Sequence, residues 1–414
     1  MRKPIVLTAV GTTGDVLPYV ALARALLDRG HAVQVHSHAI QAERFRGLDV
    51  SFRATAPDYG LEELADVFER AGRASDPLAQ FQVLAEAIFL KNAEGQYAAQ
   101  LEATRGAAVV VAHFFDYFGQ EAALANGVPL VTMTYMPETL PTAEAPPFPM
   151  KPMAPWLAKL AWVGAEVRAE ALNGQVRATL ARLRGVGLSE VRPLGIAGAM
   201  SSSCHVLAGP VGVVRRRRDW PAQVVVTGAW FDEPNGPIDP KLESFLEANG
   251  PPLVVSFGSM GGPDTEATRQ ILSDVLGWLD EPAVVQRGYA GLEVSTERVF
   301  VTDYVPHELL FPRAACVIHH AGSGTTAAVA RAGVPSVPVP HLFDQYYWAG
   351  QLHRLGVATK PIPRAELDAR ALGRAIRRVL RSASMRRRAR SLGERVAAQD
   401  GVGAAVELIE SRLT

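Results

Sequence analysis

The stretch VIHHAGSGTT, residues Val317–Thr326, joins an apolar run to a helix-like run through two histidines and a glycine turn. We predict a buried strand that ends at His319–His320 and a helix that opens with Ser323, Thr325 and Thr326. Backbone N–H groups and hydroxyls then converge where the helix dipole favours negative charge. Two interpretations stay open for this stretch alone: a capped turn with incidental histidines, or a cradle for a phosphate.

A second polar cluster follows the next apolar run. Ser336–Val339 is predicted to be a parallel strand of the same sheet, and Asp344 and Gln345 come shortly after it. The carboxyl ends of parallel strands share one edge of a sheet, so these side chains are expected beside the glycine turn. A carboxylate next to an amide offers acceptors and donors that suit the vicinal hydroxyls of a sugar. Diphosphate and sugar together indicate a nucleotide sugar.

Strand-like runs alternate with helix-like runs along most of the chain, which is the βαβ rhythm of an α/β protein. Strands are predicted at 5–10, 32–36, 109–112, 130–133, 253–257, 283–286, 299–301, 316–318 and 336–339, and helices at 17–28, 120–126, 265–279, 325–332 and 346–355. A Pro-rich loop, 137–155, precedes a mostly helical stretch, 156–184.

The length of 414 residues favours two domains with separate cores. We expect a first domain over 1–232 and a linker rich in Pro, Gly and Asp, with one short helix, over 233–252. The second domain would span 253–414, and its last helix could pack back on the first domain.

In the amino-terminal half, AVGTTGDVLP follows the first predicted strand and opens a helix. Gly11 and Gly14 permit a sharp turn, and Asp15 then lies at the carboxyl end of the strand, where open α/β sheets bind their ligands. Two roles stay open for Asp15: a cap of the helix that begins near Val16, or a functional carboxylate. The spacing is not GxGxxG, so a dinucleotide site is poorly supported.

Charge and cysteine content restrict the partners. The 42 Lys and Arg balance 42 Asp and Glu, so no overall field favours nucleic acid, and the basic clusters at 215–218 and 381–390 are expected to be solvated surface. Cys204 and Cys316 lie far apart, which indicates a reducing compartment. The apolar run after MRKP is too short to span a bilayer and has no cleavage site, so a cytoplasmic protein is expected.

These motifs resemble those of the family 1 glycosyltransferases, whose GT-B fold has two facing Rossmann-like α/β domains with an interdomain cleft. The segment 301–355 is similar to the pattern VPH…LFPR…HH(G/A)G(A/S)GTT…AG.P…P…DQ of sterol glucosyltransferases and bacterial antibiotic glycosyltransferases. GTTGDVLPYVALARAL resembles their GxxGDxxPxxALAxxL opening, and VTGAWFDEP before VVSFGSM resembles their interdomain passage. The unmatched regions, near 40–110 and 135–205, are acceptor regions in this family.

The resemblance implies a donor site in the second domain. His320 and the Thr325 end of the turn would bind the pyrophosphate, and Asp344 and Gln345 the sugar hydroxyls. Val305 and its neighbour would hold the nucleobase, partly through backbone groups. The full donor-binding set is Ser259, Tyr304, Val305, His320, Gly322, Ser323, Gly324, Thr325, Asp344 and Gln345.

The resemblance also implies a catalytic pair, with a departure from the plant members. Asp15 falls where antibiotic-type members carry a general base and plant members a histidine. The plant members orient that histidine with an Asp near residue 112, but here the strand VVVAHFFD ends in His113, with Asp116 three residues on. The pair therefore looks exchanged, although a lone histidine at a strand end is also typical of a core residue.

A second departure concerns the donor nucleotide. Plant members place a Glu that holds both ribose hydroxyls where this chain has Ala328, so a dTDP-sugar is as well supported as a UDP-sugar. For the acceptor, aromatic and apolar stretches indicate contacts at Phe89, Phe114 and Tyr135, although these stretches could equally be core.

We therefore expect an inverting glycosyltransferase that moves a sugar to a hydroxyl of a small apolar acceptor, a natural product or a sterol-like lipid. The sequence has no Asp-x-Asp, so we expect no metal, and the nucleotide sugar is a co-substrate rather than a cofactor. Two alternatives stay open: a nucleotide-sugar 2-epimerase and a non-catalytic nucleotide-sugar-binding protein. No nucleic acid and no stable membrane insertion are expected, peripheral membrane contact is left open, and the state is monomer or homodimer.

Overall fold

The apolar runs of the chain form two parallel sheets. The computed structural model describes residues 3–74, 76–232, 238–258, 265–288, 298–303 and 305–413, without the side chains at 61, 62, 65, 77, 81, 88, 89 and 265. Among these residues, the first sheet has seven strands in the order β3-β2-β1-β4-β5-β6-β7, and the second has five in the order β10-β9-β8-β11-β12. The strands are β1 (Ile5–Thr8), β2 (Val33–His38), β3 (Val50–Ala56), β4 (Val109–His113), β5 (Leu130–Thr134), β6 (His205–Leu207), β7 (Val224–Val226), β8 (Leu253–Ser256), β9 (Ala283–Gln286), β10 (Val299–Thr302), β11 (Cys316–His319) and β12 (Ser336–Pro338).

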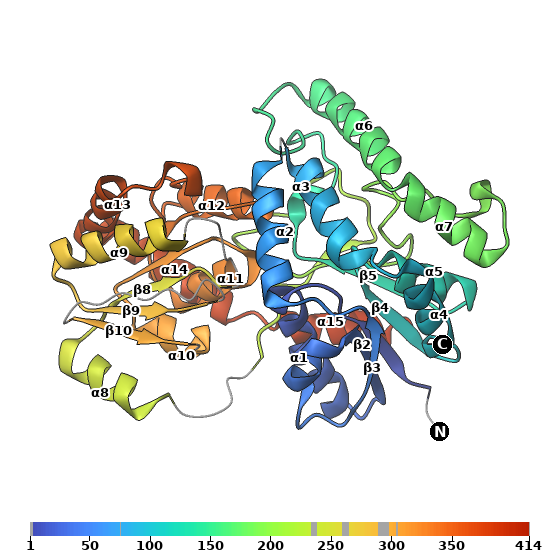
Figure 1. Ribbon diagram of the computed structural model, residues 1–414, viewed down its shortest axis with the longest axis horizontal. Helices are drawn as coiled ribbons and strands as arrows, with labels where there is room; N and C mark the ends of the chain where they lie inside the picture. Colours follow the sequence, from blue (N-terminus) through green and yellow to red (C-terminus); the bar gives the residue numbers. More distant parts are fainter. Residues whose placement is uncertain are drawn as a thin grey trace.

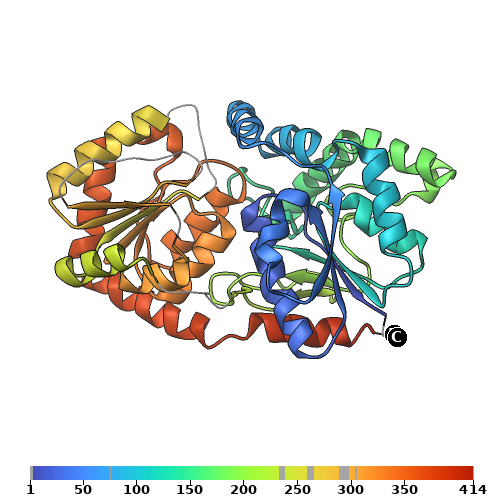
Figure 2. The same cartoon turned by 60° about the horizontal axis from the view of Figure 1, so that its bottom comes forward.

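Helices lie on both faces of each sheet, which gives two Rossmann-like domains side by side (Figure 1, Figure 2). Parallel strands require crossover connections of this kind. The helices are α1 (Thr13–Asp28), α2 (Leu61–Arg73), α3 (Pro77–Leu84), α4 (Ala93–Ala103), α5 (Tyr117–Ala125), α6 (Pro155–Leu172), α7 (Gly174–Arg184), α8 (Pro240–Asn249), α9 (Thr265–Leu279), α10 (His307–Leu310), α11 (Ser323–Ala332), α12 (Asp344–Arg354), α13 (Ala369–Arg381), α14 (Ala383–Ala397) and α15 (Gly401–Glu410). None of the helices among the described residues is both long and apolar enough to cross a bilayer.

All the predicted strands and helices are present, with small shifts at their ends. The sequence patterns do not predict β3, β6 or β7. β3 is largely exposed, because it lies at the edge of its sheet, and β6 and β7 have three residues each, too few to show a period.

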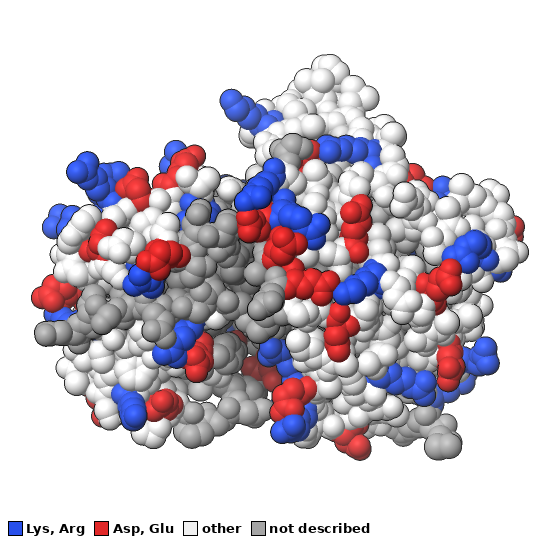
Figure 3. All heavy atoms as spheres, in the orientation of Figure 1, with Lys and Arg blue, Asp and Glu red and all other residues white. Residues whose placement is uncertain are grey.

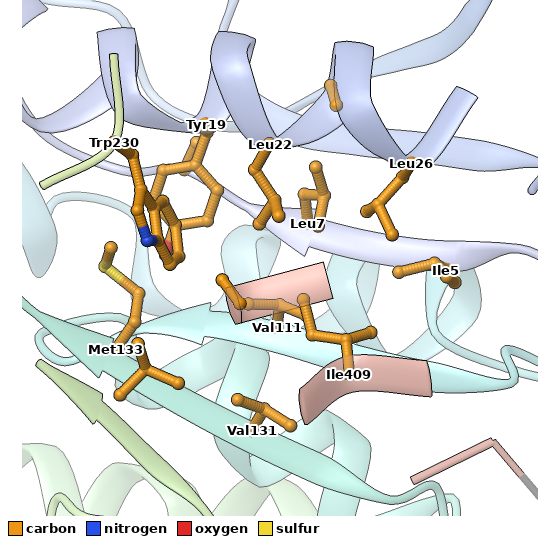
Figure 4. Packing of buried hydrophobic residues seen from close by; sticks show 14 of the residues in the cluster. Ile5, Leu7, Tyr19, Leu22, Leu26, Val111, Val131, Met133, Trp230 and Ile409 are labelled. Carbon is orange, nitrogen blue, oxygen red and sulfur yellow. The ribbon is translucent and has the colours of Figure 1, made fainter. Parts of the chain in front are cut away.

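The core of the first domain includes the last helix of the chain. Side chains of β1 and α1, such as Leu7 and Leu22, pack with Met133 of β5 and with Ile409 of α15 (Figure 4). The C-terminal segment runs from the second domain along both domains to reach this position (Figure 2). The short helix expected in the linker, α8, packs against β8 in the second domain, so it belongs to that domain rather than to a free linker. Residues 233–237 lie outside the described residues.

The two domains meet through apolar contacts near α12. Leu140 and Leu207 of the first domain share a buried cluster with Trp348 of α12. At the margin, the ring of Phe148 stacks on Tyr346 with centroids 5.7 Å apart. The first-domain loops that follow β5 therefore face the start of α12, the segment in which the donor-sugar residues are predicted.

The surface carries both signs of charge. On the face shown in Figure 3, Lys and Arg side chains alternate with Asp and Glu side chains over both domains, and neither sign covers one domain alone. This mixture agrees with the formal net charge of +0, and the described residues on this face form no broad basic area of the kind that binds a polyanion.

Candidate active site

Asp15 is held by the turn that follows β1. Gly11 has φ +118°, and a Cβ there would meet the Asp15 Oδ2 atom at 2.5 Å, so the turn requires glycine on two grounds. The backbone N–H and the hydroxyl of Thr12 both donate to Asp15 Oδ2, at 2.8 and 3.0 Å. Helix α1 begins at Thr13 with Thr12 as its N-cap, so Asp15 lies in the first turn and the expected start near Val16 is wrong.

His113 lies opposite the other oxygen of Asp15. Its Nε2 atom is 3.9 Å from Asp15 Oδ1, beyond hydrogen-bond distance but close enough to interact electrostatically. The His113 side chain is 4% exposed and that of Asp15 is 32% exposed, so the carboxylate is the accessible member of the pair. Burial lowers the pKa of His113, and the nearby Asp15 charge opposes that shift. His113 is therefore neutral near pH 7.

Asp116 serves a different purpose. It is the N-cap of α5, where its Oδ1 accepts from the Gly119 N–H at 2.9 Å. Burial raises its pKa to about 6, and the hydrogen bonds from Gly119 and Thr8 oppose the rise. The structure brings His113, rather than Asp116, next to Asp15.

The three expected acceptor residues have different surroundings. Phe114 is 3% exposed and packs in the cluster that contains Tyr117 and Phe118, so it lies in the core, the alternative that the sequence left open. Tyr135 is also buried, and its hydroxyl donates to the Asp15 backbone oxygen at 2.8 Å. The side chain of Phe89 lies outside the described residues.

His320 occupies a slot between two glycines in the second domain. A Cβ on Gly322 would meet its Nε2 at 2.4 Å, and one on Gly258 would meet its Cε1 at 3.0 Å. The Nδ1 atom is buried without a hydrogen-bond partner. Burial lowers the pKa of His320 to about 4, although a backbone contact with Ser256 opposes the shift, so the ring is neutral near pH 7 and would bind an anion by donating an N–H rather than as a cation.

The rest of the glycine turn presents the start of α11. Gly322 is the N-cap, Ser323 and Gly324 are at least partly exposed, and Thr325 is buried at 7% exposure. The first N–H groups of a helix have no partner within it, so this end can receive an anion. Ala321 holds φ +64°, an uncommon conformation for alanine that turns the chain sharply after His320.

Asp344 and Gln345 open α12 beside this turn. Asp344 Oδ2 accepts from the Trp348 indole N–H at 3.1 Å. Burial raises the pKa of Asp344 to about 7, the Asp15 charge raises it further, and hydrogen bonds from Trp348 and the Ser323 backbone oppose the rise. Gln345 Oε1 accepts from two backbone N–H groups of its own loop, those of 341 and 342, at 2.7 and 3.1 Å. The Gln345 oxygen thus shapes the loop.

The nucleobase region is only partly described. The Val305 carbonyl accepts from the Gln286 side-chain amide at 2.7 Å, and the Val305 side chain packs in the core. Ser259 and Tyr304 lie outside the described residues. Gln286, at the end of β9, is a polar group at this edge that the motifs did not single out.

Glu138 is a further carboxylate at the junction that the sequence analysis missed. It lies in the 3-10 turn η3 (Pro137–Thr139) after β5, and both of its carboxyl oxygens are buried without a hydrogen-bond partner. Burial raises its pKa well above the usual value, and the charge of Asp344 adds to the rise. The charge of Asp15 raises the pKa of Asp344, and the charge of Asp344 raises the pKa of Glu138. Two first-domain carboxyls thus interact electrostatically with Asp344 of the second domain. In the sequence, the position of Glu138 in the Pro-rich loop, 137–155, was the available signal for this residue.

Family models match both domains. Residues 5–143 match the glycosyltransferase family 28 N-terminal domain, and residues 270–409 match the C-terminal domain of the erythromycin biosynthesis protein CIII-like family. The first match contains Asp15 and His113, and the second contains His320 and Asp344, so the models cover both halves of the candidate site.

Relatives and solved structures match the whole chain. It is 31% identical to the O-mycaminosyltylonolide 6-deoxyallosyltransferase of Streptomyces fradiae, over 98% of this chain and 96% of that protein. It is 29% identical to a sterol 3-beta-glucosyltransferase of Arabidopsis thaliana, over 100% of this chain and 68% of that protein. The glycotransferase of kitacinnamycin gives a TM-score of 0.73 at 19% identity over 100% of both chains. The glycosyltransferase VinC in complex with dTDP gives 0.69 at 20% identity over 99% of both. The identity over nearly full length and the shared two-domain fold lead to one assignment: the chain belongs to the GT-B glycosyltransferases and is a glycosyltransferase.

Proposed function

We propose that this enzyme is an inverting, metal-independent glycosyltransferase that moves a sugar from a UDP- or dTDP-sugar to a hydroxyl of an apolar small molecule. One observation carries the proposal: the accessible carboxylate of Asp15, beside His113, lies near enough to Asp344 of the second domain for its charge to raise the pKa of Asp344. An acceptor bound by the first domain and a donor bound by the second would meet there. The names of two relatives, an O-mycaminosyltylonolide 6-deoxyallosyltransferase and a sterol 3-beta-glucosyltransferase, support a natural product or a sterol-like molecule as the acceptor.

Asp15 would act as the general base through Oδ1. As the acceptor oxygen forms its bond to the anomeric carbon, its proton passes to Asp15 Oδ1. The bond from that carbon to the diphosphate oxygen breaks on the opposite face, and the nucleoside diphosphate leaves with the electron pair. One displacement of this kind inverts the anomeric configuration. Proton transfer by a positioned side chain typically contributes about 10²–10⁴-fold in rate.

His113 would assist Asp15 as a neutral ring. Its Nδ1 accepts from the Phe115 N–H at 3.4 Å, which leaves the Nε2 proton on the side of Asp15 Oδ1. At 3.9 Å this N–H does not form a hydrogen bond, but its dipole lies on the side of Oδ1 and would help to orient the carboxylate. In this mechanism His113 orients and stabilises the Asp15 carboxylate and need not itself accept the proton. The roles of the two residues are therefore not a simple exchange of those in the plant members.

The leaving diphosphate would be stabilised by the second domain. The first N–H groups of α11, the Thr325 hydroxyl and the His320 ring supply donors where negative charge develops. The sequence has no Asp-x-Asp, the usual metal clamp of the other glycosyltransferase fold. We therefore expect the transfer rate to persist in excess chelator. A rate that is lost in chelator and restored by Mg²⁺ or Mn²⁺ would contradict metal independence.

Ala328 supports a dTDP-sugar as well as a UDP-sugar. The side chain at this position is buried and apolar and offers no carboxylate to a ribose 2′-hydroxyl. The solved complex of VinC with dTDP shows a protein of the same fold with that nucleotide. A thermal-shift panel of UDP, dTDP and GDP discriminates the donors, since a ligand at 100 times its Kd stabilises by about 2.7 kcal/mol.

The experiment that tests the proposal is Asp15→Asn. The amide keeps the shape of the side chain but cannot accept the proton, so we expect kcat to fall by about 10²-fold or more. Diphosphate affinity, measured by titration calorimetry, should stay unchanged because that site belongs to the other domain. An Asp15→Asn enzyme with near-wild-type turnover would leave Asp15 as a helix residue only.

A further inference from the structure

Two side chains from other elements form hydrogen bonds with the backbone of Gly11, one with its N–H and one with its carbonyl oxygen. The Gly11 N–H donates to Nε2 of His38, the last residue of β2, at 3.0 Å. The Tyr59 hydroxyl, from the loop after β3, donates to the Gly11 carbonyl oxygen at 2.8 Å. His38 is 0% exposed and Tyr59 is 6% exposed. Both backbone groups of one residue are thus satisfied by two buried side chains.

The partners of His38 and Tyr59 fix which atom donates. His38 Nδ1 is 2.6 Å from the Pro57 carbonyl oxygen, which can only accept, so the proton lies on Nδ1 and Nε2 is free to accept from Gly11. The Gln41 side-chain amide donates to the Tyr59 hydroxyl at 2.8 Å, which directs the Tyr59 proton to Gly11. The two rings also touch edge to face, with centroids 5.0 Å apart.

This arrangement requires a neutral His38. Protonation would place a second N–H on Nε2, opposite the Gly11 N–H, and the contact would become repulsive. Burial lowers the pKa of His38, while the Pro57 carbonyl and the charges of Asp58 and Asp15 oppose the shift.

Gly11 in turn determines where Asp15 lies. The Asp15 carboxyl group packs directly over the Gly11 α-carbon, at the position a Cβ would need. The next peptide N–H, that of Thr12, binds Asp15 Oδ2 and leaves Oδ1 toward His113. A shift of the Gly11 backbone would therefore move the N–H that orients the carboxylate.

We propose that His38 and Tyr59 are positioning residues for the Asp15 base, acting through the Gly11 backbone. This rests on the proposed function of Asp15. Neither residue touches substrate in this mechanism. Their loss would leave both substrates bound and misplace the carboxylate, and a misplacement of about 1 Å costs about 10²-fold in rate.

The test uses Tyr59→Phe, which removes one oxygen, and His38→Ala, which removes the acceptor. We expect kcat to fall by about tenfold or more in each, with the KM of donor and acceptor nearly unchanged. His38→Gln should recover much of the lost rate, because the Gln amide oxygen can take the place of Nε2 as acceptor. If His38 had only a structural role, the His38→Gln variant would not regain kcat when its thermal stability matches that of His38→Ala.

Two matched controls separate positioning from general loss of stability. Tyr19→Phe removes a buried hydroxyl that has no hydrogen-bond partner, and His36→Gln alters a buried histidine of the same strand that bonds Gln34 and Gln100 instead. Both controls should keep kcat, whatever their melting temperatures. If Tyr59→Phe and His38→Ala also keep kcat while their melting temperatures fall, the positioning role is wrong.

A double mutant distinguishes failure of this inference from failure of the proposed function. In an Asp15→Asn background, His38→Ala should lower the residual rate no further, because the residue acts only through Asp15. An equal fold-loss in both backgrounds would overturn the inference while the base role stands. Near-wild-type turnover of Asp15→Asn alone would overturn the base role, and the positioning role with it.

Discussion

Asp15 offers its two carboxylate oxygens to different partners. Oδ2 accepts from Thr12 at the start of α1, and Oδ1 lies toward His113 and the domain junction. A helix-terminal role and a base role therefore do not compete for the same atom. Loss of a terminal contact costs about 1 kcal/mol of stability, whereas loss of the base appears in kcat. The two roles are measured separately in one variant.

Asp344 is predicted to act on the sugar rather than on the nucleotide. Above pH 7, where the Asp344 carboxyl is ionised, we expect Asp344→Asn to lower sugar transfer by about 10–10²-fold, since a hydrogen bond to a charged group contributes about 1.5–3 kcal/mol. Calorimetry with the free diphosphate should show unchanged affinity. The amide preserves the volume beside Trp348, so packing is a small part of the effect. Equal losses for diphosphate and for transfer would place Asp344 at the nucleotide instead.

At the scale of the element, the turn between β11 and α11 works through the fit of His320 between glycines. Gly322 has φ −61°, which any residue adopts. Glycine is therefore required here because a Cβ would meet the His320 ring, and not because of the backbone conformation. This makes glycine substitution a direct probe of where the ring lies.

We predict that His320→Ala and Gly322→Ala weaken diphosphate binding by similar amounts. The first removes the ring and the second displaces it, and each forfeits a hydrogen bond to phosphate of about 1.5–3 kcal/mol, or roughly 10–10²-fold in Kd. Gly350→Ala, on α12, is the matched control because no atom lies within 4 Å of its added Cβ. Titration calorimetry in which Gly322→Ala binds like the Gly350 control would show that the ring position does not matter.

The sequence predicted elements and site residues where local pattern carries the information. Buried parallel strands such as β9 and β11 are continuous apolar runs, and the glycine turn lies directly after one of them, so both were visible. His38, Tyr59 and Glu138 were not, because their contacts depend on how separate loops pack and no spacing within the sequence records it. Phe114 was indicated as an acceptor contact, but an aromatic next to a strand end has the same pattern whether it packs inward or outward.

At the scale of the whole molecule, burial of histidine dominates the expected response to acid. Eight of the ten histidines have a lowered pKa, with burial as the first cause in each, and in six of these the pKa falls to about 3 or about 4. The eight are His36, His38, His113, His205, His307, His319, His320 and His341. In the unfolded chain they protonate near the usual 6.5. Their contribution to stability is therefore present above pH 6.5 and is lost as the pH falls toward their folded values.

Three buried carboxyls act in the opposite direction. The pKa of Asp116 is raised to about 6, that of Asp344 to about 7, and that of Glu138 well above its usual value, in each case mainly by burial. Their contribution is present below the unfolded pKa near 4 and is lost as the pH rises through the folded values. They are fewer than the histidines, so the net slope between pH 4 and 6.5 follows the histidines.

We therefore predict that the free energy of unfolding of the ligand-free enzyme falls steeply as the pH is lowered from about 6.5 to about 4. Urea denaturation at a series of pH values measures it. His205→Asn is the informative variant, because its amide can keep the contact of Nδ1 with Thr132 while removing a group whose pKa burial lowers to about 3 and whose Nε2 has no partner. The variant should flatten the slope by up to about 1.4 kcal/mol per pH unit, the value for one proton. A wild-type stability that stays level or rises on acidification would mean that these histidines are hydrated in solution, and an unchanged slope in His205→Asn would remove that residue from the set.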